Sequence, residues 1–114
     1  MTVEHVFAGL PVVHLDVALE WYARLFDRPP DLVPNEREAA WHVADAAWIV
    51  VIHDAKRAGT AKLTIMVDDL DELIEALVES GIGSTPVEKV TGKFRRTVVT
   101  DPGGNSITFG QSLA

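Results

Sequence analysis

The chain has 114 residues, no cysteine and a formal net charge of −7. This length predicts one domain spanning residues 1–114, and the lack of cysteine excludes disulfide and thiol chemistry. The negative charge argues against nucleic acid as a partner, because phosphates repel an acidic surface. No apolar stretch approaches the roughly 20 residues of a membrane span. Residues 1–9 lack the pattern of a signal peptide, so we expect a cytoplasmic protein without membrane contact.

Hydrophobic periodicity predicts a strand, a helix and three further strands in the first half. Polar and apolar residues alternate over residues 3–12, and apolar residues recur at helical spacing over residues 15–26. Pro29 and Pro30 then end the helix, because proline cannot continue it. Residues 31–34 are expected to form a short edge strand. Residues 39–43 and 46–53 are expected to form a hairpin.

The second half starts again after the polar residues 54–60, which we interpret as a linker. Residues 62–67 alternate as a strand, and Asp68 is a candidate N-cap for the helix that follows. That helix is expected to end at Ser80-Gly81, since glycine is common just after a helix. Three more strands are expected, at residues 85–90, 94–100 and 106–109.

The two halves look like copies of one unit. Three residues of the first helix region reappear 70 − 15 = 55 positions later. The matching pairs are Leu15 and Leu70, Asp16 and Asp71, and Glu20 and Glu75. The order of elements also repeats, which predicts an α+β fold of two βαβββ modules, at about residues 3–53 and 61–110, arranged as a pseudo-twofold cup.

One face of the sheets is expected to line a cavity or a subunit contact. By alternation, the apolar faces of the strands meet the helices, and the opposite faces are mixed in polarity. The mixed faces consist of His5, Phe7 and Gly9; Lys62, Thr64 and Met66; and Ser106, Thr108 and Gly110. A simply solvated sheet face is the alternative interpretation.

Three segments, in the right order, resemble the glyoxalase/bleomycin-resistance (vicinal oxygen chelate) superfamily. They are residues 12–22, which read VVHLDVALEWY, residues 67–71, which read VDDLD, and the turn residues 101–107, which read DPGGNSI. The resemblance implies a U-shaped, barrel-like cup, usually within a homodimer. It also implies that metal-dependent members hold a divalent ion there, through ligands on the first and last strands of each module.

Transferred to this chain, the superfamily's ligand positions fall on Phe7, Lys62 and Thr108, with a fourth on Val50 or Val51. None of these side chains is a good ligand for zinc or a harder divalent cation. The resemblance therefore implies no metal and no cofactor here. A displaced site using His5 or His53 is the alternative.

The leading functional hypothesis is a metal-free, homodimeric protein that binds a small organic molecule and sequesters a drug or natural product, as in antibiotic resistance. The residues expected to line its cup are Phe7, Trp41, Val51, Lys62, Thr64, Met66 and Thr108. One alternative is a metal-dependent isomerase, lyase or dioxygenase with displaced ligands. Another is a non-catalytic dimerisation module.

Overall fold

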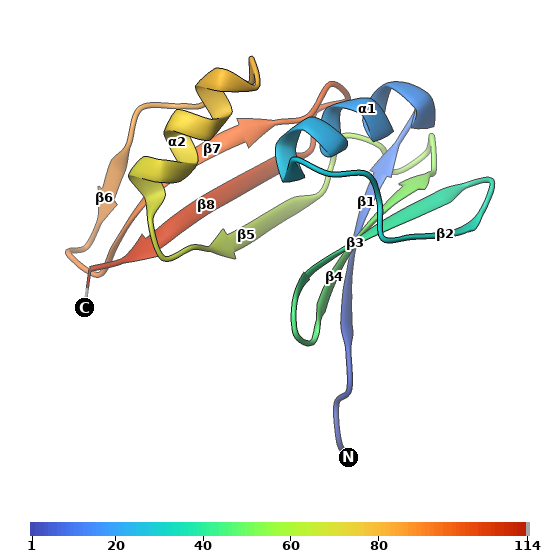
Figure 1. Cartoon of the computed structure of the whole chain (residues 1–114), viewed down its shortest axis with the longest axis horizontal. Helices are drawn as coiled ribbons and strands as arrows, with labels where there is room; N and C mark the ends of the chain where they lie inside the picture. The colour runs from blue at the N-terminus through green and yellow to red at the C-terminus, as the bar shows by residue number, and fades with distance from the viewer. Residues whose placement is uncertain (114) are drawn as a thin grey trace.

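The computed structural model describes residues 1–113, which form two four-stranded sheets with one helix each (Figure 1). Sheet A contains, in spatial order, β1 (Val6–Val12), β4 (Ala47–His53), β3 (Glu38–Ala44) and β2 (Leu32–Asn35). Sheet B contains, in spatial order, β5 (Lys62–Met66), β8 (Ser106–Ser112), β7 (Phe94–Thr100) and β6 (Glu88–Val90). Helix α1 (Leu15–Phe26) follows β1, and α2 (Leu70–Glu79) follows β5.

The sheets confirm the predicted α+β fold of two βαβββ modules. In each module the first strand pairs in parallel with the last, β1 with β4 and β5 with β8, and the other pairs are antiparallel. A parallel pair needs a crossover connection, and the helix that follows each first strand begins that connection. Neither sheet closes into a barrel, which agrees with an open cup.

Both helices lie on the same side of the molecule, and the N-terminus projects away from them (Figure 1). Their apolar stripes and the inner faces of both sheets form one hydrophobic core. Tyr22 of α1 and Leu70 of α2 are both fully buried in it. No helix in residues 1–113 is long and apolar enough to cross a membrane.

Several element ends differ from the sequence expectation. Strand β1 starts at Val6 instead of residue 3, and β6 covers only the last three residues of the expected strand 85–90. The N-cap of α2 is Asp69, whose carboxylate accepts the backbone N–H of Glu72, and not Asp68. Both aspartates are good N-caps by residue type, so only the backbone geometry distinguishes them.

A buried polar cluster joins the two modules. The Tyr22 hydroxyl of α1 donates to the carboxylate of Asp101 at 2.8 Å, and Asp101 lies in the turn between β7 and β8. The Asn105 amide donates to the same carboxylate and to the backbone carbonyl of Pro11 on β1, both at 2.8 Å. Burial and the hydrogen bond to Asp101 raise the pKa of Tyr22 well above its usual value, so this phenol remains a hydrogen-bond donor.

Candidate binding site on the open sheet faces

The strand registers define which side chains lie on the open face of sheet A, away from α1. Leu10 pairs with Val51, and both are buried in the core, so the alternate residues Phe7 and Gly9 belong to the open face. Phe7 pairs with Trp48 and Gly9 with Val50. The sequence left the superfamily's fourth metal-ligand position open between Val50 and Val51. Of these two residues, Val50 is the one that lies on the open face.

The prediction that Trp41 and Val51 line the cup is wrong. Both side chains are 0% exposed and belong to the core. The Trp41 ring lies 5.7 Å from the ring of Phe26, and its indole N–H donates to the backbone carbonyl of Arg28 at 3.0 Å. A shift of one residue in strand register exchanges the two faces, and alternation alone did not fix that register.

Three aromatic rings form a row across sheet A, which we call the aromatic row: Phe7 on β1, Trp48 on β4 and His42 on β3. The Phe7 and Trp48 rings are 5.7 Å apart with an interplanar angle of 18°, and the Trp48 and His42 rings are 4.5 Å apart at 19°. These separations are close to the roughly 4.8 Å between neighbouring strands, so the rings stack in the direction that crosses the strands. Phe7 remains 55% exposed at the end of the row.

Hydrogen bonds fix His42 in this row. Its backbone N–H donates to the Asp31 carboxylate at 2.8 Å, and its backbone carbonyl accepts from Arg28. Its ring Nε2 lies 3.0 Å from the carbonyl oxygen of Asp45, which makes Nε2 the donor. The His42 N–H and the Arg28 guanidinium hold the pKa of Asp31 below its usual value, so Asp31 stays an ionised acceptor near neutral pH.

Trp48 carries a buried polar atom that the fold does not satisfy. Its indole N–H is inaccessible to solvent and has no acceptor within residues 1–113. A buried donor without a partner is destabilising by about 1–3 kcal/mol, and such groups are rare enough to mark strained or functional positions. The row therefore contains a buried donor that no group of residues 1–113 satisfies.

An apolar crevice of about 330 Å³ lies between the two modules and reaches Trp48. This volume falls within the range of about 300–1,000 Å³ typical of small-molecule sites. Three groups of residues line it: Val6 and Ala8 of β1; Val43, Ala44, Ala47, Trp48 and Ile49 of the β3–β4 hairpin; and Leu63, Thr64, Ile65 and Met66 of β5. The crevice joins two of the predicted residues, Thr64 and Met66, to the aromatic row.

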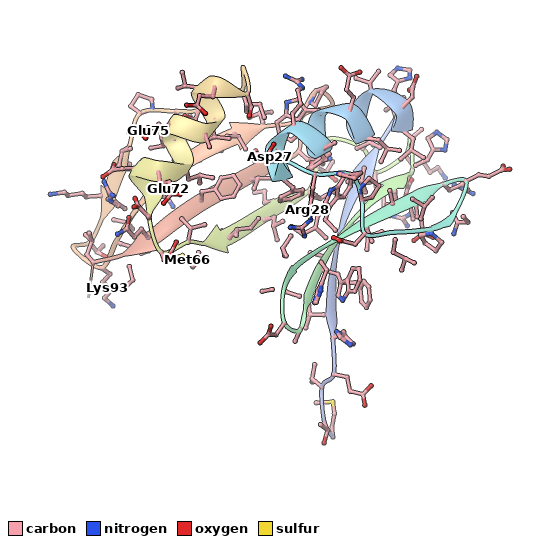
Figure 2. All side chains as sticks on the ribbon, in the orientation of Figure 1. Asp27, Arg28, Met66, Glu72, Glu75 and Lys93 are labelled. Atoms are coloured by element: carbon pink, nitrogen blue, oxygen red, sulfur yellow. The ribbon has the colours of Figure 1, made fainter. Side chains whose placement is uncertain are left out.

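On sheet B the predicted face is open. Lys62, Thr64 and Met66 are exposed along β5, and Thr108 of β8 pairs with Thr64. Met66 lies at the end of β5, whereas Glu72 and Glu75 lie on α2 (Figure 2). Lys62 and Thr108 do not line the crevice, so the structure places them on the same sheet face without bringing them to Trp48.

The residues at the positions where metal-dependent members of the superfamily bind their ion cannot bind a divalent metal ion here. Phe7 and Val50 offer no donor atom, the Lys62 ammonium repels a cation, and the Thr108 hydroxyl is a weak ligand. Within residues 1–113, no three side chains of histidine, cysteine, aspartate or glutamate come together as a ligand set. His5 and His53 lie at opposite ends of sheet A, about 20 Å apart along the strands, so one ion cannot bind both.

The sequence prediction did not include His42 or Trp48 among the site residues. Trp48 lies beside Phe7 because β1 pairs in parallel with β4 in this register. That register joins strands about 40 residues apart, and no local pattern encodes it.

Comparison with solved structures shows close similarity over nearly the whole chain. A glyoxalase/bleomycin resistance protein from Catenulispora acidiphila is 31% identical, with a TM-score of 0.88 over 94% of this chain and 96% of that one. An antibiotic binding protein from Streptomyces sp. CB03234 is 21% identical, with a TM-score of 0.77 over 98% of each chain. A lactoylglutathione lyase from Agrobacterium tumefaciens is 17% identical, with a TM-score of 0.77 over 93% of this chain and 91% of that one.

The last two similarities, at low identity, concern the fold alone. No family sequence model and no curated protein sequence matches the chain. The first similarity combines 31% identity with coverage of almost all of both chains, and it agrees with the order of strands and helices described above. The chain therefore belongs to the glyoxalase/bleomycin resistance protein family.

Proposed function

We propose that this chain is a binding protein that holds a small, flat organic molecule at the aromatic row without changing it chemically. It acts as a cytoplasmic homodimer that needs no metal, and it sequesters a drug or natural product. The observation that carries the proposal is the aromatic row itself, an ordered stack of Phe7, Trp48 and His42 with an exposed end.

The chemistry of this surface supports binding over catalysis. Stacked rings attract flat apolar molecules, and each aromatic pair contributes about 0.5–1.5 kcal/mol beyond the burial of its area. The adjoining crevice offers further apolar surface. The side chains at the family's ligand positions cannot replace a metal centre, because they provide neither a set of donors nor a paired acid and base.

Two further observations agree with this proposal. The antibiotic binding protein from Streptomyces sp. CB03234 has the same fold over 98% of this chain. The edge strands β1 and β5 both carry exposed apolar side chains, Phe7 and Met66, which a second copy of the chain would cover. The dimer would thus close the cup that one chain leaves open.

Tryptophan fluorescence tests the proposal, because only one of the three tryptophans lies on the open face. Trp21 and Trp41 are buried in the core, whereas Trp48 is half-buried at the aromatic row. A panel of planar aromatic natural products should quench the wild-type fluorescence. Trp48→Phe should remove most of the quenching yet keep the binding heat in calorimetry, since a phenyl ring preserves stacking.

Phe7→Ala should weaken binding about 2- to 10-fold, the equivalent of one lost aromatic pair. Val33→Ala provides the control, because Val33 is an exposed apolar residue on β2 and lies outside the aromatic row. Bound compound should be recovered unchanged. Its conversion to a product by protein containing about one tightly held metal ion per chain would instead identify an enzyme and reject the proposal.

A further inference from the structure

The apolar crevice between the modules has an exposed rim and a buried floor. Val6 of β1 is 57% exposed and Met66 of β5 is 53% exposed, so these two side chains form its rim. Met66 stands at the end of β5 (Figure 2). Ile49 of β4 lines the same crevice but is only 2% exposed, so it forms the floor. The crevice is therefore a hollow that reaches the core and not a flat apolar surface.

A small residue, Ala8, leaves this hollow open beside the floor. Ala8 pairs with Ile49 across β1 and β4. By alternation it shares its face of β1 with Leu10 and Val12. Those two large side chains fill the core and are almost fully buried, whereas Ala8 has a single methyl group and is only half-buried. The face that is filled at one end of β1 is thus hollow at the other end.

The lining of the crevice suits hydrocarbon better than water. None of its eleven residues is charged. The indole N–H of Trp48 is inaccessible to solvent, so the Thr64 hydroxyl is the one polar side-chain group that the lining offers. A water molecule in a hollow needs two to four polar partners, and displacing poorly held water by an apolar group is favourable.

The size of the crevice indicates a small molecule. Its 330 Å³ equals about eleven water molecules at about 30 Å³ each, and a methylene group is similar in size, so it holds a chain of about ten carbon atoms. A stable protein–protein interface takes about 20–30 residues from each side, whereas eleven residues line this crevice. A second protein surface is therefore too large an occupant for it.

We propose that the crevice is a binding site for an uncharged aliphatic chain of up to about ten carbon atoms. The methyl end of the chain lies against Ile49 and Ala8, and its polar end stays in solvent between Val6 and Met66. The inference goes beyond the proposed function, because a chain bound here needs no ring on the aromatic row.

Linear primary alcohols from butanol to dodecanol test the site in wild-type protein by calorimetry. The affinity should rise about 2- to 4-fold with each added methylene group, because each one buries more apolar area. The rise should level off at about ten carbons, when the crevice is full. Decanediol has the chain of decanol but a hydroxyl group at each end, so it should bind at least 10-fold more weakly.

Ala8→Ile fills the floor with three more carbons, and isoleucine suits a strand. It should shorten the chain length at which the rise levels off by about three carbons, weaken decanol binding about 10-fold or more and leave butanol binding almost unchanged. Ala47→Ile fills the crevice from β4 and should act in the same direction. Ala55→Ile is the matched control and should equal the wild type, because Ala55 is exposed in the linker and does not line the crevice.

Affinity that does not depend on chain length, or decanediol binding as tight as decanol binding, would overturn the inference in the wild type alone. Unchanged decanol affinity in folded Ala8→Ile would overturn it too, and quenching by planar compounds would still support the proposed function. If no alcohol binds and a dimer dissociates in Ala8→Ile, the inference is wrong and the crevice belongs to a second copy of the chain. Alcohol binding without any binding of planar compounds would reject the proposed function and support this site.

Discussion

Asn105 makes the most informative target for testing how the two modules are held together. Its side chain is 0% exposed and makes three hydrogen bonds. The amide oxygen accepts the N–H of Ala61 at 3.0 Å, and the amide nitrogen donates to the Pro11 carbonyl and the Asp101 carboxylate, each at 2.8 Å. Asn105→Ala removes all three and leaves the N–H of Ala61 and the carbonyl of Pro11 without these partners.

The cost follows from these contacts. A buried group that loses its hydrogen-bond partner is destabilising by about 1–3 kcal/mol, so Asn105→Ala should lower the free energy of unfolding by about 3–5 kcal/mol. That is a large part of the 5–15 kcal/mol that typically stabilises a domain. For a domain of this size, at roughly 4 °C per kcal/mol, the melting temperature should fall by roughly 12–20 °C.

The second asparagine of the chain provides a matched control. Asn35 also uses its side chain in two hydrogen bonds, to Glu38 and to the N–H of Arg37, but it is exposed at the end of β2. Asn35→Ala should cost about 0.5 kcal/mol or less, as surface substitutions usually do. Thermal melting followed by circular dichroism measures both variants. Equal melting temperatures for the two would refute the assignment of Asn105 as a buried link between modules.

Two further predictions concern Tyr22 and Gly59. Because burial and the hydrogen bond to Asp101 raise the pKa of Tyr22 in the folded state, its contribution to stability is complete below its unfolded pKa of about 10 and is lost as pH rises above that value. Tyr22 is the only tyrosine, so tyrosinate absorbance should appear together with unfolding; ionisation in a chain whose circular dichroism is still native would contradict this. Gly59→Ala should destabilise the chain more than Gly92→Ala in urea titrations, because both have a positive φ but only the Gly59 Cβ would lie 2.5 Å from the carbonyl oxygen of Gly103. Equal urea midpoints for the two variants would show that the linker around Gly59 can move away from Gly103 without cost.

Local patterns determined the elements and their repeat. Alternation and helical spacing report the environment of neighbouring residues, so the helix over residues 15–26 and the strand over residues 94–100 match α1 and β7 as observed. The residues of the closing turn 101–105 and the Asp16 and Asp71 repeat indicated the family fold. On β5, alternation also identified the exposed face of Lys62, Thr64 and Met66.

Only the tertiary structure decided which residues meet across the sheets. The faces of Trp41 and Val51 depended on a register that one residue reverses, and packing against α1 settled it. The aromatic row depends on the parallel pairing of β1 with β4, and the Tyr22–Asp101 bond joins residues 79 positions apart. Such contacts form because the chain closes long loops around one core, and that information is distributed over the whole sequence and not written in any local segment.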